Sequence, residues 1–128
     1  MSDLGIAPGS GKRGIARLKA ALGNSWAGLC TTLRTEIAFR QEMLLACFFI
    51  PCALIMDVTL MQHIMLVFSI VLVLIVELLN TAIERVVDRI SFDRHELSKE
   101  AKDIGSAAVL IALIFAAFTW IAILFLWK

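Results

Sequence analysis

Residues 77–88 read Glu-Leu-Leu-Asn-Thr-Ala-Ile-Glu-Arg-Val-Val-Asp, and this stretch decides how the chain folds. It continues a run from Ile64 to Val76 that contains no charged residue. A helix turns by about 100° per residue, so the polar residues of the stretch project within about 80° of one another. These residues are Glu77, Asn80, Glu84 and Asp88. The sequence therefore predicts an apolar helix with one acidic face.

The depth of Glu77 determines how that face must be oriented. If Ile64 lies at one edge of a bilayer core, Glu77 lies about 20 Å inside it, at about 1.5 Å per residue. A charge near the bilayer centre costs roughly 2.5–3.5 kcal/mol to insert. We therefore expect Glu77 to face a partner helix or a polar cavity. Asp88 is the exception, since a solvated charge at the helix end explains it equally well.

Charge-free runs identify the chain as a membrane protein. Its 128 residues are 60% hydrophobic, whereas soluble domains are about 45–50% apolar. The apolar residues gather in three runs without charge, at residues 43–56, 64–76 and 104–127. A run of about 20 residues is enough to span a bilayer. We predict an all-α membrane protein whose three transmembrane helices lie at about 37–56, 63–88 and 104–127.

The segment before the first span is expected to form one more helix, along the membrane surface. Its apolar residues recur in steps of three and four, which is the spacing of an amphipathic helix at about 15–34. They are Ile15, Leu18, Leu22, Trp26, Leu29 and Leu33. Such a helix suits the inner membrane surface, although packing against the spans is an alternative. Residues 1–14 are expected to be a disordered lead-in without a signal peptide, and residues 15–128 a single membrane domain.

Positive charges predict the orientation in the membrane. Six Lys and Arg residues precede the charge-free run at 43–56, and five more lie between the runs at 64–76 and 104–127. The turn between the first two spans contains only Asp57 and His63 as ionisable residues. Because Lys and Arg favour the cytoplasmic side, the N-terminus is predicted to be cytoplasmic and the C-terminus periplasmic. The polar residues of the chain then gather at the cytoplasmic face.

The polar residues at that face favour phosphoryl transfer. Carboxylates with an amide oxygen suit Mg²⁺, which is commonly held by one or two carboxylates together with substrate phosphates. Lys102 and Arg17 could neutralise phosphate charge, and Glu77, the deepest carboxylate, suits a general base. Since that base would lie below the headgroups, the acceptor should be a membrane-resident alcohol. A proton- or ion-conducting helical bundle would use similar residues and stays an alternative.

Other site types find no support in the sequence. No His and Cys cluster suggests zinc, no Ser-His-Asp set suggests a hydrolase, and no nucleic-acid partner is expected. Residues 9–12, Gly-Ser-Gly-Lys, suggest a phosphate-binding loop, but Ile6 and Arg13 occupy positions where that motif needs Gly and Ser or Thr. Glu36 and Arg40 have the spacing of an ordinary ion pair on a helix surface. That pairing is the expectation here, and a metal-binding role for Glu36 is the alternative.

Several motifs resemble the prokaryotic diacylglycerol kinase family. They are residues 77–84 (ELLNTAIE), 87–89 (VDR), 95–98 (HELS), 36–42 (EIAFRQE) and 101–108 (AKDIGSAA). The resemblance runs from about Arg17 to the C-terminus. It implies a homotrimeric enzyme of the bacterial inner membrane that transfers the γ-phosphate of MgATP to diacylglycerol and so yields phosphatidic acid. Relatives that phosphorylate undecaprenol share the core motif, so an undecaprenol kinase is the alternative within the family.

The resemblance also implies a role for individual residues. Glu77 would be the catalytic base, supported by Asn80, while Glu36 and Glu84 would hold Mg²⁺ and ATP. Further ATP contacts would come from Arg17, Asp93, His95, Lys102 and Asp103. The lipid site would be lined by Ser25, Trp26, Ala38, Arg40, Gln41 and Ser106, together with Glu77. One departure concerns Asn24, which stands where family members can carry an aromatic residue, so a stacking contact is not expected there.

Overall fold

The computed structural model of the chain describes residues 14–127, and these residues form helices without any strand. The expected lead-in at residues 1–14 lies, apart from Gly14, outside the described residues, as does Lys128. Four α-helices and one π-helical turn follow one another along the chain. They are α1 (Ile15–Thr35), α2 (Ile37–Ile55), α3 (Leu60–Ile90), α4 (Glu96–Ile121) and the turn η1 (Ala122–Leu126). The predicted all-α class is confirmed.

The chain divides into two compact units, the first ending at Thr31 and the second beginning at Thr32. The first unit contains most of α1, which follows Gly14 in the left-handed region at φ 63°. Four apolar side chains of α1, Ile15, Leu18, Leu22 and Trp26, are exposed, from 61% for Leu18 to 84% for Ile15, whereas Leu29 and Leu33 are partly buried. The predicted helix is therefore present, and its apolar residues have the spacing of one face. Its location on a membrane surface stays a prediction.

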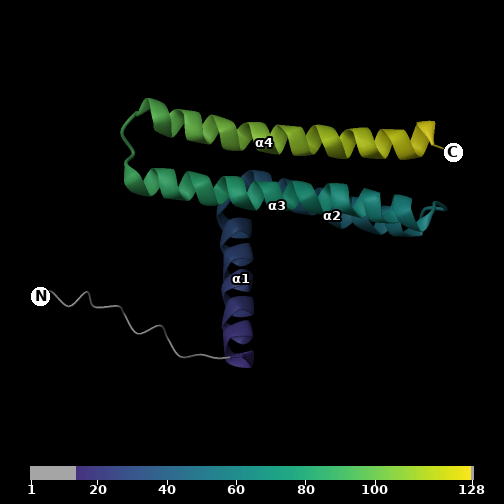
Figure 1. The fold of residues 1–128 in the computed structure, drawn as a ribbon, viewed down its shortest axis with the longest axis horizontal. Helices are drawn as coiled ribbons and strands as arrows, with labels where there is room; N and C mark the ends of the chain where they lie inside the picture. The colour runs from purple at the N-terminus through teal and green to yellow at the C-terminus, as the bar shows by residue number, and fades with distance from the viewer. Residues whose placement is uncertain (1–13, 128) are drawn as a thin grey trace, which may run out of the picture. The chain divides into compact units, whose positions relative to one another are not determined.

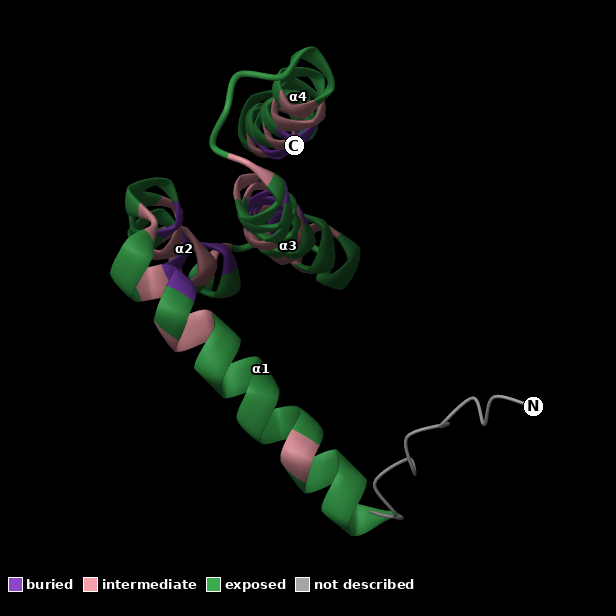
Figure 2. Ribbon diagram, turned by 90° about the vertical axis from the view of Figure 1, so that its left-hand side faces the viewer, coloured by how far each residue is buried: buried purple, intermediate pink, exposed green. Residues whose placement is uncertain are grey.

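The second unit consists of three long apolar helices, each long enough to cross a membrane. Figure 1 shows α2, α3 and α4 running side by side, and the turned view in Figure 2 shows α3 between the other two. α3 packs against both α2 and α4. The predicted three spans are confirmed as helices, and α3 is the central one.

Small residues let the three helices pack closely. Near the end of α3 that contains Leu66, this fully buried side chain meets Ala53 of α2 and Ile123 of η1. Further along α3, Val73 packs against Ala112 and Ala116 of α4. Between helices in lipid, van der Waals packing takes the place of hydrophobic burial, and small side chains permit the close approach that it needs. The small residues of α4 therefore define the face that it turns towards α3.

Local capping explains where α3 and α4 begin. Thr59 and Gln62 form a capping box, so α3 begins at Leu60, ahead of the predicted residue 63. His95 caps α4 by accepting a hydrogen bond from the Leu97 N–H on its Nδ1 at 3.2 Å. α4 therefore begins at Glu96, eight residues before the predicted residue 104. The charge-rich segment before the third span is thus not wholly a connector, since its second half forms the first two turns of α4.

Candidate active site

The polar face of α3 is turned into the helix bundle. Glu77 is 6% exposed and Asn80 is 8% exposed, and both continue the buried stripe that contains Leu66 and Val73. The stripe changes from apolar to polar as α3 approaches its C-terminal end. The expectation that Glu77 faces neighbouring helices is confirmed, since it is buried within a single chain on a helix that packs against both α2 and α4.

A glycine of α4 makes room for Asn80. A Cβ atom on Gly105 would overlap with Oδ1 of Asn80, and it would also lie 3.3 Å from Cγ of the same side chain. The amide nitrogen of Asn80 donates to Oε1 of Glu84 at 3.3 Å, one turn further along α3. Its Oδ1 is buried and has no hydrogen-bond partner among the described residues. Gly105 therefore lets α4 pack directly against the Asn80 side chain, whose Oδ1 accepts no hydrogen bond from the described residues.

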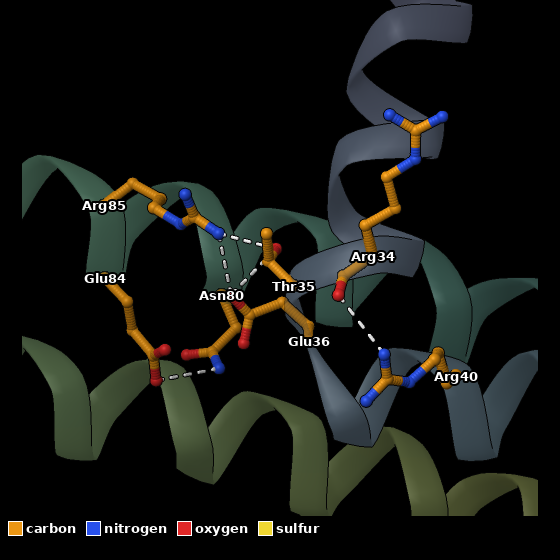
Figure 3. Close-up of polar contacts among 7 residues, drawn as sticks. All are labelled: Arg34, Thr35, Glu36, Arg40, Asn80, Glu84 and Arg85. Carbon is orange, nitrogen blue, oxygen red and sulfur yellow. Dashed lines mark hydrogen bonds and ion pairs between the residues drawn. The ribbon is translucent and has the colours of Figure 1, made fainter.

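Glu36 binds α3 through an arginine rather than through its neighbour on α2. Nη2 of Arg85 donates to Oε1 of Glu36 at 2.9 Å and to Oγ1 of Thr35 at 2.6 Å (Figure 3). Arg40, the expected partner of Glu36, instead donates to the backbone oxygen of Arg34 at 3.2 Å. The predicted Glu36–Arg40 pair is therefore wrong. Glu36 has extended backbone just before α2, at φ −107° and ψ 115°, so its side chain does not follow the helical i,i+4 geometry.

Glu77 lies within electrostatic reach of both Glu84 and Glu36. It is also close enough to influence Glu42, a half-buried residue of α2. Oε2 of Glu42 is buried without a hydrogen-bond partner in the described part of the chain. Glu36, Glu42 and Glu84 thus lie within the range of charge–charge repulsion from Glu77.

A pocket of about 650 Å³ opens where α3 ends and α4 begins. Four of the residues expected to bind ATP line it, namely Asp93, His95, Lys102 and Asp103. Nζ of Lys102 binds Oδ1 of Asp88 at 2.6 Å and so joins the first turns of α4 to the last turn of α3. Asp103 pairs with Lys99 at 2.7 Å. Asp88 is therefore paired rather than a free end charge.

The remaining predicted residues are divided between the two units. Arg17, Ser25 and Trp26 belong to the first unit. Ala38, Gln41 and Ser106 are exposed side chains of the second unit. Their expected roles therefore stay predictions.

Sequence reasoning missed two residues at this site. Glu42 is the only carboxylate within the predicted first span at about 37–56, and a single acidic residue in a span is a signal that could have found it. In the sequence, Arg85 is only one of the five positive charges that lie between the second and third charge-free runs. No local pattern identifies it, because its partner Glu36 lies 49 residues away in sequence.

The donor groups fit a hard divalent cation that is shared with a substrate. No group of three or more His, Cys, Asp or Glu side chains within residues 14–127 is arranged to hold a metal by itself. Mg²⁺, however, usually takes one or two protein carboxylates and completes its shell with phosphate oxygens and water. Glu36, which is bound by Arg85, and Glu84, which is bound by the amide nitrogen of Asn80, are two carboxylates of the second unit that fit this requirement.

Fold and site together define a helical membrane protein with a buried carboxylate, Glu77, and a pocket lined by both basic and acidic side chains. The sequence model of the family "Prokaryotic diacylglycerol kinase" matches residues 23–124. A diacylglycerol kinase of Pseudomonas aeruginosa is 47% identical over 117 residues, which are 91% of this chain and 95% of that protein. The diacylglycerol kinase of Escherichia coli K12 is 49% identical over 111 residues, 87% of this chain and 91% of its own length. That of Haemophilus influenzae is 45% identical, covering 88% and 95%.

The chain belongs to the prokaryotic diacylglycerol kinase family. It is thus an enzyme of membrane lipid metabolism and a kinase, as the motifs predicted. This membership decides against a proton- or ion-conducting bundle as the class of protein.

The contact between Gly105 and Asn80 yields a prediction. Gly105→Ala adds a Cβ that overlaps the Asn80 carboxamide, so this side chain must turn away from Glu84. Because loss of a supporting contact at such a site typically costs 10–100-fold in activity, we expect kinase turnover to fall by about tenfold or more. Circular dichroism should show an unchanged helix content.

Gly23→Ala is the matched control for this experiment. A Cβ at Gly23 meets no atom within 4 Å, so the same chemical change there should leave turnover unaltered. Wild-type turnover of the Gly105→Ala enzyme would contradict a role for the Gly105–Asn80 contact.

Proposed function

We propose that this protein transfers the γ-phosphate of ATP to the hydroxyl group of diacylglycerol and produces phosphatidic acid. The observation that carries the proposal is the burial of Glu77 within a transmembrane helix, on the same face as Asn80 and about three turns before the pocket that contains Lys102. A buried carboxylate and a pocket with basic side chains at the end of the same helix suit a lipid alcohol and a water-soluble phosphate donor. The relatives that match nearly the whole chain are named for the same substrate.

In this proposal Glu77 acts as the general base. Its carboxylate takes the proton from the lipid hydroxyl as the hydroxyl oxygen forms a bond to the γ-phosphorus. The bond between the γ-phosphorus and the bridging oxygen breaks, and ADP leaves with the electron pair of that bond. Phosphoryl transfer of this kind needs positioning and charge neutralisation more than covalent catalysis. Asn80 would keep the neighbouring Glu84 oriented during this step, through the hydrogen bond that joins them.

Glu36 and Glu84 would hold Mg²⁺, which would neutralise charge on the ATP phosphates. Lys102 and Asp103, with Asp93, His95 and Arg17, would contact ATP. The lipid would meet Ser25, Trp26, Ala38, Arg40, Gln41 and Ser106. We propose that this machinery lies at the cytoplasmic face of a bacterial inner membrane, with residues 15–128 acting as one kinase domain. The Lys and Arg residues that flank the spans support this orientation.

The lipid substrate is tested directly with purified protein. Detergent-solubilised enzyme is incubated with labelled ATP, Mg²⁺ and separate samples of diacylglycerol and undecaprenol. We expect labelled phosphatidic acid from diacylglycerol, at a rate well above that of undecaprenol. Preference for undecaprenol would assign the alternative lipid within the family, and no labelled lipid from either sample would overturn the proposed function.

The general base is tested by Glu77→Gln, which preserves size and removes the proton acceptor. General-base catalysis contributes about 10²–10⁴-fold, so we expect kcat to fall within that range while a non-hydrolysable ATP analogue still binds. Glu100→Gln removes an exposed carboxylate of α4 and serves as the control. Near wild-type kcat of Glu77→Gln with dioleoylglycerol would refute the base assignment.

We also propose a homotrimer. In a single chain the small residues Ser106, Ala107 and Ala108 of α4 are exposed, and they leave room for a close helix contact with another chain. Native mass spectrometry from detergent is expected to give three times the 14.1 kDa mass of one chain. A mass of one or two chains in detergent that preserves activity would contradict the trimer.

A further inference from the structure

Arg85 connects Glu36 and Glu84, the two carboxylates of the proposed metal site, because it binds the first and is the neighbour of the second in sequence. It follows Glu84 directly in sequence, and its guanidinium reaches Glu36 at the start of α2. Glu84 itself is held by the amide of Asn80. One turn of α3 therefore contains Glu84 and also binds Glu36, through the side chain of Arg85 (Figure 3).

Glu36 has few other restraints. It lies at the break between α1 and α2 in extended backbone, and its side chain makes no capping hydrogen bond to α2. Apart from Arg85, the only side chain that binds its carboxylate within the described residues is Thr35, whose hydroxyl donates to Oε1 at 3.4 Å. Arg85 also binds that hydroxyl, at 2.6 Å. One guanidinium nitrogen thus fixes both residues that precede α2.

The bond leaves a ligating oxygen on Glu36. Arg85 occupies Oε1, and no hydrogen bond to Oε2 is found in the described part of the chain. The pair is partly open to solvent, with 52% of the Arg85 side chain and 29% of the Glu36 side chain exposed. An exposed ion pair of this kind stabilises a fold only weakly. Its effect should therefore lie in the orientation of the carboxylate more than in the stability of the bundle.

We propose that Arg85 is a positioning residue, which orients Glu36 so that this carboxylate and Glu84 can share the Mg²⁺ that accompanies ATP. This inference rests on the proposed function, since it concerns the nucleotide site of the same enzyme. Groups that orient metal ligands through hydrogen bonds typically contribute 10–100-fold to metal affinity or activity. Arg85 itself touches neither the metal nor the reacting atoms in this role.

The experiment measures nucleotide binding with and without metal. A fluorescent, non-hydrolysable ATP analogue is titrated into wild-type protein and Arg85→Ala, once in saturating Mg²⁺ and once in EDTA. We expect Arg85→Ala to weaken binding by about tenfold in Mg²⁺, and by less than about twofold in EDTA, where Glu36 has no metal to hold. Equal weakening in both conditions would mean that Arg85 contacts the nucleotide or supports the fold, and no weakening in either would mean that it has no role. Tighter binding in Mg²⁺ would mean that Arg85 competes with the metal. Each of these three results overturns the proposal.

Three further variants make the result specific. Arg89→Ala removes a positive charge one turn further along α3, from an exposed side chain that forms no ion pair among the described residues, and should bind the analogue like wild type. Arg85→Lys preserves the charge and a donor and should recover part of the Mg²⁺-dependent affinity, whereas Arg85→Gln keeps the packing volume and should not. Arg85→Gln serves in place of Arg85→Ala if the latter does not fold. Wild-type protein that binds the analogue but phosphorylates no lipid would count against the proposed function alone.

Discussion

The structure depends on the requirement that a carboxylate inside an apolar span must not face lipid. Glu77 meets it because α3 lies between α2 and α4, so a single chain already leaves only 6% of this residue exposed. A carboxylate on α2 or α4 would be covered less completely, because each of these helices packs mainly against α3 alone. The same requirement explains the composition of α4, whose Gly105, Ala112 and Ala116 bring its backbone close to the polar and apolar parts of the α3 stripe.

The features predicted from sequence are those that a local period or a local composition determines. Charge-free runs indicate the three spans, and the 100° step of a helix places Glu77 and Asn80 on a shared face. Oxygen donors beside basic residues indicate phosphoryl transfer by their chemistry alone. Burial of that face then follows from the cost of exposing charge to lipid.

Features that the sequence did not reveal depend on long-range or capping geometry. Spacing pairs Glu36 with Arg40, yet the extended backbone of Glu36 turns it towards Arg85 on another helix. The helix that contains the predicted third span begins eight residues before the span, at Glu96, where the Leu97 N–H binds His95; composition does not reveal this start because the charge-rich segment resembles a connector. The wrong pairing of Glu36 comes from treating a residue at a helix end as if it had the regular geometry of a helix interior.

A gradient of burial along α3 gives the proposed reaction its direction. Glu77 and Asn80 are nearly inaccessible, whereas the Asp88 side chain at the end of the stretch is 41% exposed and bound to Lys102 at the pocket. These positions span about 17 Å of helix, at about 1.5 Å per residue. Because ATP cannot enter lipid and the acyl chains cannot leave it, the two substrates of the proposed reaction would approach this face of α3 from its opposite ends. One helix that changes from apolar to polar along a single face supplies groups for both, so the acidic stretch accounts for the fold and for the chemistry at once.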